Sequence, residues 1–404
     1  MAGQHTVRDL NQQALLQLLR RGDTYSRAQL ARALGLTKAT VSAIAADLLR
    51  QNLLVEQGMT AVGDRGGRPG ATLALNPRGA SFLGAECSES HVAVIALRLD
   101  GSEIGRERVE LEPRPTLDTI MLELVRLVCL LRERYAEELP NLLGLGLAVP
   151  GMLSQDGTIS WFPGLHWAPV RLAEKLERQL DLPVVVENDA NASAMAELLL
   201  GEDDLPNILY LLLDLGVGSA IVVDRTLYRG SEGRSGEVGH MRLALDGPRC
   251  PHCGGTGCFE SMVNSDAIER YFLESSTQRL HWRSVLSSID SDEHSRQAFD
   301  RWTWWLARGL LNLAYVLNPS EIVLGGVVPH LAPGLVDNLE DRLHVDIAAT
   351  GGTTSLRLST FGEIQSAIGA AALVYQQVFT PAAFQPLHLP TPDRRDVAQV
   401  AVNT

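Results

Sequence analysis

The first 50 residues contain three stretches in which apolar side chains recur every three or four positions, the spacing of one face of a helix. Ser26 precedes the second stretch and Thr37 the third, and both residue types cap the N-termini of helices. Gly35 lies between these two stretches, where a tight turn is needed. Three short helices with such a turn are typical of a helix-turn-helix unit, although a small helical bundle without a nucleic-acid role would show the same pattern.

Two short apolar stretches around a polar, glycine-rich loop follow in residues 53–76. We interpret them as the wing of a winged helix. The loop contains the sequence RGGRPG, which suits either an arm that lies in a narrow minor groove or a flexible linker. In a winged helix the first turn of the third helix enters the major groove. The residues that we expect to contact DNA are Arg27, Thr37, Lys38, Thr40, Ser42, Arg65 and Arg68.

From residue 81 the apolar positions follow the pattern of strands, beginning with an antiparallel meander that turns at Asp100 and Gly101. Further strands are expected at residues 142–150, 183–188, 208–216, 219–224 and 321–326, and helices at 117–134, 170–180, 300–317, 333–343 and 364–379. Two successive strand-rich units, each followed by helices, indicate two α/β lobes with a cleft between them. Ligands of such folds bind near the carboxyl ends of the strands.

The pattern therefore predicts three parts: a DNA-binding domain in residues 1–78, a two-lobed domain in residues 79–380, and a tail in residues 381–404. The tail contains four prolines and ends in polar residues, so we expect it to lie loose or along the surface. A length of 404 residues is sufficient for two or three domains with full cores.

Charge supports this division. Residues 1–80 contain 10 basic and 5 acidic side chains, out of 35 and 48 in the whole chain, so the remainder is strongly acidic. This asymmetry suggests that only the first part meets a polyanion. No apolar run approaches the roughly 20 residues that span a bilayer, and the polar N-terminus lacks the apolar core of a signal peptide. Because the cysteines form no disulfide framework, we expect a cytoplasmic protein.

Three of the five cysteines lie close together, as Cys250, Cys253 and Cys258, and His240 precedes them. Three thiolates and one imidazole are a ligand set that zinc binds in a tetrahedron, so we expect a structural Zn²⁺ site in the loop 240–258. His252 is a rival fourth ligand, but we prefer His240 because the loop must close onto something outside itself. The alternative is three unrelated buried thiols. Two carboxylates, Glu237 and Glu260, flank the cluster.

Several motifs together resemble the ROK family of repressors and sugar kinases: VPGM at 149–152, ENDANASAMAE at 187–197, GEVGH at 236–240, CPHCGGTGCFE at 250–260 and IVLGG at 322–326. The helix-turn-helix unit and its GRP element are similar to those of the repressor branch. The resemblance implies a winged helix-turn-helix followed by a two-lobed, actin-like α/β domain of the sugar-kinase type. It also implies that sugar hydroxyls contact Asn188, Asp189, Glu237, His240 and Glu260. Taken alone, the residues around Asn188 would instead be interpreted as a helix cap.

This chain departs from the family pattern in three places. Two residues, Pro251 and His252, separate the first two cysteines, where the family usually has one. The first glycine-rich turn of a kinase should follow Asp-x-Gly-x-Thr, whereas this chain has GAECSE at 84–89. The second turn, DLGVGS at 214–219, retains two glycines but lacks the threonine expected of kinases. Phosphoryl transfer depends on such turns, so the sequence argues against kinase activity.

Our hypothesis from the sequence is a sugar-responsive transcriptional regulator, and most simply a repressor of sugar uptake or catabolism genes that is not an enzyme. The expected partners are a palindromic DNA operator, a monosaccharide effector and a second copy of the chain, as a homodimer or a dimer of dimers. The resemblance implies that the sugar releases the protein from DNA, but the alternative that the sugar promotes DNA binding stays open. The alternative hypothesis is an ATP-dependent sugar kinase that carries a DNA-binding domain, because Asp189, the family's catalytic base, is present. The residues do not distinguish glucose, xylose and N-acetylhexosamines.

Overall fold

The structure is a computed structural model that describes residues 7–20, 22–59, 71–139, 141–154, 157–161, 169–201, 205–332, 334–349 and 351–379. Arg65, Arg68 and the tail from residue 381 lie outside the described residues, so the predictions made for them stay predictions. Among the residues described here, no helix combines the length and the apolar character needed to cross a membrane.

The N-terminal unit consists of helices packed on a small sheet. Its described elements are α1 (Val7–Leu19), β1 (Tyr25–Ser26), α2 (Arg27–Ala33), α3 (Lys38–Arg50), β2 (Leu54–Met59) and β3 (Ala71–Leu75), with the strands in the order β1-β3-β2. Both predicted caps are confirmed: the Ser26 side chain accepts from the amide of Gln29, and the Thr37 side chain accepts from the amide of Thr40. Gly35 has a φ of 64°, which explains the glycine between the last two helices.

The first lobe is built on a five-stranded sheet in the order β10-β7-β4-β5-β6. Its strands are β4 (Ser81–Cys87), β5 (His91–Arg98), β6 (Glu103–Glu110), β7 (Leu142–Val149) and β10 (Val184–Asn188), and a short pair, β8 (Met152–Leu153) and β9 (Ile159–Trp161), follows β7. The predicted antiparallel meander β4-β5-β6 is confirmed, and β7 pairs in parallel with both β4 and β10. Helices α4 (Leu117–Arg134) and α5 (Leu172–Leu180) cover one face, where they pack on alternate apolar residues of the strands.

The second lobe has a five-stranded sheet in the order β13-β12-β11-β14-β15. Its strands are β11 (Ile208–Leu213), β12 (Val217–Val223), β13 (Thr226–Leu227), β14 (Glu321–Gly325) and β15 (Ser355–Leu358). Its helical elements after β13 are η1 (Val238–His240), α7 (Phe259–Val263), α8 (Ser265–Ser275), α9 (Trp282–Ser287), α10 (Glu293–Leu317), α11 (Val327–Leu331) and α12 (Leu335–Ala349). The core between these helices and the sheet is centred on the fully buried Trp302. The predicted helix at 300–317 in fact begins at Glu293, where Asp292 caps it.

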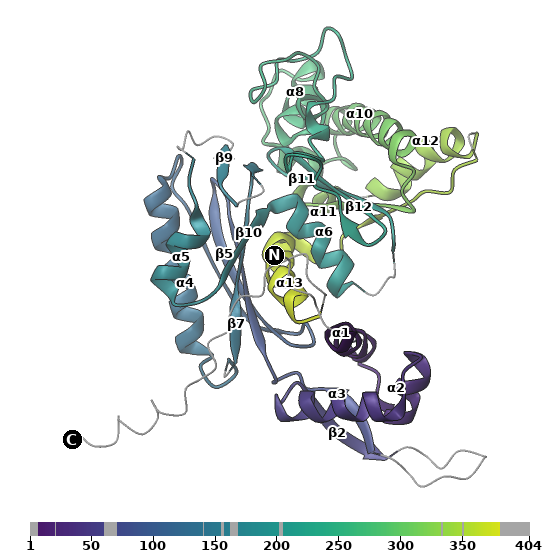
Figure 1. Cartoon of the computed structure of the whole chain (residues 1–404). Coiled ribbons are helices and arrows are strands. Elements are labelled where there is room, and N and C mark those ends of the chain that lie inside the picture. The colour runs from purple at the N-terminus through teal and green to yellow at the C-terminus, as the bar shows by residue number, and fades with distance from the viewer. Residues whose placement is uncertain are drawn as a thin grey trace, which may run out of the picture.

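Two helices lie between the lobes, as Figure 1 shows. They are α6 (Asp189–Leu200), which directly follows β10, and α13 (Gln365–Phe379), which follows the 3-10 turn η2 (Gly362–Ile364). A Cβ on Gly369 would lie 1.7 Å from the carbonyl oxygen of Ala192, so the two helix backbones touch there. Gly84 and Gly146 likewise let α13 approach strands β4 and β7.

Each strand-rich unit is followed by helices along the chain, as expected, but α13 does not stay with the second unit. The C-terminal helix returns to the first sheet and covers the apolar face formed by Phe82, Ala93 and Ile95. The same core includes Leu15, Leu16 and Leu19 of α1, so α13 also contacts the N-terminal unit. In Figure 1 this unit lies beneath α13 and joins the rest of the molecule there.

Candidate functional site

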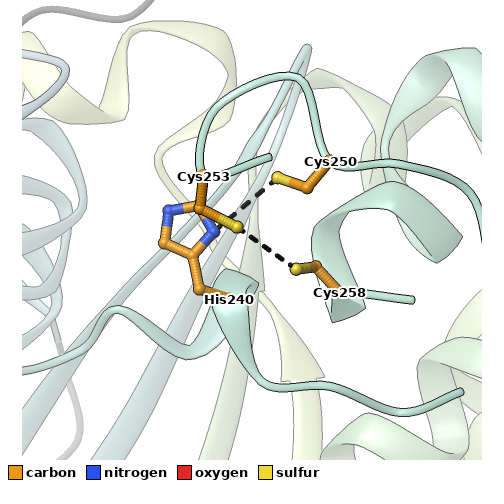
Figure 2. A group of neighbouring side chains, drawn as sticks. All are labelled: His240, Cys250, Cys253 and Cys258. Atoms are coloured by element: carbon orange, nitrogen blue, oxygen red, sulfur yellow. Dashed lines mark hydrogen bonds between the residues drawn. The ribbon is translucent and has the colours of Figure 1, made fainter. Parts of the chain in front are cut away.

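The four side chains that the cysteine spacing selected lie together, as Figure 2 shows. His240 ends η1, Cys250 and Cys253 lie in the loop before α7, and Cys258 directly precedes that helix. The ligand atoms all lie within 4.8 Å of one another. The Sγ atoms of Cys253 and Cys258 are 3.5 Å apart, and Cys250 Sγ is 3.8 Å from His240 Nδ1.

These separations fit a zinc ion. Zinc–sulfur bonds of about 2.3 Å in a tetrahedron place neighbouring ligand atoms about 3.8 Å apart, close to the two distances observed. Burial raises the pKa of the Cys250 thiol, and it raises the pKa of the Cys258 thiol to about 12. A bound cation would hold both groups as thiolates. The residues of the cluster therefore fit a structural metal.

The geometry separates the two candidate histidine ligands. Nδ1 of His240 faces the cluster, while its Nε2 lies 4.0 Å from Glu237 Oε2. Nδ1 of His252 instead lies 2.9 Å from Glu260 Oε2. Among the described residues, His240 lies in one group with all three thiols, whereas His252 is grouped with Cys250 alone of the thiols, so the arrangement favours His240 as the fourth ligand. Cys250, His252 and Glu260 form a smaller group that overlaps the first.

Glu260 is buried and is held by two segments of the second lobe. Its Oε1 accepts from the amide of Val217 at 3.4 Å, and its Oε2 lies beside His252. Burial opposes the charge of Glu260, but the hydrogen bond from His252 and the positive charge of that ring keep the pKa of Glu260 below its ordinary value. In return, the hydrogen bond to Glu260 raises the pKa of His252. Burial raises the pKa of Glu237.

Asn188 and Asp189 lie at the junction of β10 and α6, at the carboxyl end of a parallel strand. Asn188 is the N-cap of α6: its Oδ1 accepts from the amide of Asn191 at 3.0 Å, and its Nδ2 donates to the carbonyl of Gly151 at 3.1 Å. The interpretation of this motif as a helix cap is therefore correct for Asn188. Oδ1 of Asp189 accepts from the amide of Ala190.

The turn between β11 and β12 lies between the two groups of predicted contact residues. A Cβ on Gly216 would be 2.7 Å from Glu260 Oε1, and a Cβ on Gly218 would be 3.9 Å from Asp189 Oδ1. Asp189 and Glu260, which are 71 positions apart in the sequence, thus both lie beside the short segment 216–218. Burial, with smaller effects of the Asp214 and Glu86 charges, raises the pKa of Asp189 to about 7.

In the segment 84–89, where a kinase would have its first glycine-rich turn, the side chain of Glu86 contacts the N-terminus of α13. Glu86 is buried, and its Oε2 accepts from the amide of Ala367 in the first turn of α13 at 3.2 Å. Its Oε1 lies 2.7 Å from His91 Nε2. Helix N-termini attract anions, so Glu86 supplies the negative charge at this one. The sequence did not reveal this contact, because Ala367 lies 281 positions away.

Five of the candidate DNA-contacting residues belong to the described part of the chain, and they lie at the start of α2 and α3. Lys38 and Ser42 are exposed on the first turns of α3. The hydroxyls of Thr37 and Thr40 lie 2.9 Å apart and help to form the start of this helix. Arg27 forms an ion pair with Glu56 of β2 at 2.8 Å.

A sequence profile of the ROK family matches residues 83–377, which is most of the chain. The chain belongs to the ROK family. A xylose repressor of Bacillus subtilis is 26% identical over 384 residues, which cover 93% of this chain and 97% of that protein. A glucokinase of Halalkalibacterium halodurans is 31% identical over 255 residues, which cover 59% of this ROK chain and 77% of the glucokinase.

Among solved structures, a ROK family transcriptional regulator described as a homologue of the Escherichia coli MLC protein superposes with a TM-score of 0.78. It is 23% identical, and the match covers 92% of this ROK chain and 97% of the regulator. The matches to the repressor and to the regulator each cover more than 90% of this chain, whereas the match to the glucokinase covers 59% of it. The resemblance to the ROK family that the motifs predicted is confirmed.

Proposed function

We propose that this ROK protein is a transcriptional regulator that binds DNA through its N-terminal unit and responds to a monosaccharide bound by its two lobes. The observation that carries the proposal is the N-terminal unit itself. It precedes the segment matched by the family profile, and it shares a hydrophobic core with α13. The end-to-end match to a xylose repressor supports the same role.

The N-terminal unit is, in this proposal, a winged helix-turn-helix. The packing of α1, α2 and α3 on the sheet of β1, β3 and β2 supports it. Lys38 and Ser42 would contact DNA from the exposed first turns of α3, while Thr37 and Thr40 would support that turn through their own hydrogen bond. Arg27 would contact a phosphate only after leaving Glu56. The roles proposed for Arg65 and Arg68 follow from the sequence alone.

The sugar would bind around the turn between β11 and β12, because both Asp189 and Glu260 lie close to it. Carboxylates accept paired hydrogen bonds from vicinal hydroxyls, which suits Asp189, Glu237 and Glu260 to a monosaccharide. Asn188 would add a polar contact from the same junction, and His240 would lie behind Glu237. Zinc held by His240, Cys250, Cys253 and Cys258 would bind the loop to η1 and so hold Glu237 and Glu260 in place.

The proposed mode of DNA binding uses the twofold symmetry of a dimer. Two chains paired through their large domains would present two α3 helices to the half-sites of a palindromic operator. A sugar that favours one placement of the lobes would change the spacing of these helices, and such coupling is typically about 1–3 kcal/mol. We propose that sugar releases the DNA and thereby induces genes of sugar uptake or catabolism, in the cytoplasm of the cell.

A kinase is the second candidate, because a glucokinase is among the relatives and Asp189 is present. The arrangement of Glu86 supports the regulator instead. Its carboxylate lies at the N-terminus of α13, so a phosphate at this turn would meet a buried negative charge. Asp214 accepts from the amide of Val327 at 2.6 Å and adds a second carboxylate nearby.

The two candidates are separated by assaying ADP release with ATP, Mg²⁺ and a panel of glucose, xylose and N-acetylglucosamine, alongside a thermal shift with each sugar. The proposal expects at least one sugar to raise the melting temperature without turnover. Sustained ADP release that depends on the sugar would contradict the regulator-only function.

A further inference from the structure

A segment of the second lobe reaches across to the first lobe next to Asn188. We call residues 228–236 the strap. Its ends are anchored to β12, because the amide of Tyr228 donates to the carbonyl of Ile221 and the Ser219 hydroxyl donates to the carbonyl of Gly236, both at 2.8 Å. Its middle lies against β8: a Cβ on Gly233 would be 2.8 Å from the carbonyl oxygen of Leu153.

The strongest contact of the strap is an ion pair between the lobes. Nη2 of Arg229 lies 2.6 Å from Oε2 of Glu187, the penultimate residue of β10. The Glu187 side chain is only 11% exposed, whereas that of Arg229 is 40% exposed. The carboxylate therefore depends on this partner more than the guanidinium does, because a buried charge without a partner is costly.

Glu187 in turn holds the junction that carries the candidate sugar contacts. Its Oε1 accepts from the amide of Asn188 and from Nδ2 of Asn191, both at 3.0 Å. Asn191 is also the residue whose amide Asn188 caps. One carboxylate thus binds Arg229 from the second lobe through one oxygen and orders the junction of β10 and α6 through the other.

We propose that Arg229 is a positioning residue that makes the geometry of Asn188 and Asp189 depend on how the two lobes are placed. When the lobes are placed as in this structure, Arg229 neutralises Glu187, and Glu187 orients the Asn188 amide and the Asn191 side chain. A placement that separates the strap from β10 removes this partner and loosens the junction. Sugar affinity and lobe placement are then linked through one ion pair. That the ligand is a sugar rests on the proposed function, whereas the effect of Arg229 on the junction of β10 and α6 does not.

The experiment compares Arg229→Ala, Arg229→Lys and the unmodified full-length chain. The matched control is Arg126→Ala, which removes a similar exposed arginine from its ion pair with Glu123 on α4, within the first lobe. Hydrogen exchange of the peptide that spans residues 187–191 is measured without sugar. Affinity for glucose, xylose and N-acetylglucosamine is then measured by calorimetry.

In Arg229→Ala we expect faster exchange in residues 187–191 and about a tenfold or greater loss of affinity for whichever sugar binds the unmodified chain. Arg229→Lys, which keeps the charge, is expected to lie between the two, and Arg126→Ala to match the unmodified chain. Unchanged exchange and unchanged affinity in Arg229→Ala would overturn the inference. If none of the three sugars binds the unmodified chain, the sugar part of the proposed function fails, and the exchange rates alone decide the role of Arg229.

Discussion

Replacing Cys253 with serine tests the metal centre where the cluster is most accessible. Cys253 is exposed, unlike Cys250 and Cys258, so the substitution leaves the hydrophobic core untouched. Serine is nearly isosteric but is a poor zinc ligand. The loop has hydrogen bonds of its own, from the amide of Cys250 to Gly255 and from the amide of Gly254 to Cys250. We therefore expect the loop to lose its metal without unfolding the lobe.

The size of the effect follows from the four ligands. Structural zinc sites bind with an apparent free energy of about 10–16 kcal/mol, so each of four ligands contributes about 2.5–4 kcal/mol if they contribute equally. That corresponds to a loss of about two to three orders of magnitude in metal affinity. Because the loop holds Glu260 through His252, sugar affinity should fall with it, while DNA affinity without sugar should not change.

The assay is zinc content by elemental analysis after dialysis against a weak chelator, followed by sugar and DNA titrations. Cys129→Ser is the control, because Cys129 is also exposed but lies on α4, outside the cluster. His240→Ala and His252→Ala then identify the fourth ligand. We expect His240→Ala to lose zinc and His252→Ala to retain it. Full zinc occupancy in Cys253→Ser, or the reverse result for the two histidines, would refute the assignment.

Three further predictions concern the fold. Burial raises the pKa of Asp189 to about 7, against about 3.9 in an unfolded chain. The folded state therefore binds more protons at Asp189 between these values, so this group should lower the free energy of unfolding as pH rises from about 4 to about 7. Urea melts of Asp189→Asn should lack this contribution to the slope of the free energy of unfolding against pH. An unchanged slope would contradict the shift. Gly369→Ala should lower the free energy of unfolding by about 1–3 kcal/mol in the same assay, because its Cβ would meet the carbonyl of Ala192. An unchanged free energy of unfolding would exclude close contact of α6 and α13. Leu16→Ala should cost about 2–5 kcal/mol and lower the melting of the whole chain, whereas a separate early transition would contradict a core shared with α13.

Local patterns in the sequence predicted local structure well. Helix α4 spans the predicted residues 117–134, because Thr116 caps an amphipathic stretch. The caps at Ser26 and Thr37 could be predicted equally well, because a capping hydrogen bond joins residues only three positions apart. The spacing of His240 and the cysteines likewise brought together residues that the fold does place together.

Contacts between distant segments could not be predicted in this way. Glu86 belongs to the segment 84–89 that departs from the kinase pattern, but its partner in α13 lies at the other end of the chain. Arg229 lies in an irregular segment without any motif, and its importance comes only from Glu187 in the other lobe. The short helices α7, α8, α9 and α11 also escaped prediction. In α7 and α11, which have five residues each, the apolar positions are too few to show a period.

The central claim is that a sugar bound between the lobes controls DNA binding by the N-terminal unit. The most direct measurement uses DNA selected by the full-length chain from a random pool and follows its binding by fluorescence anisotropy during titration with glucose, xylose and N-acetylglucosamine. The account predicts that one sugar weakens DNA binding, and that Glu260→Ala binds the same DNA equally well but no longer responds. Failure to select any DNA, or an unchanged sugar response in Glu260→Ala, would contradict it.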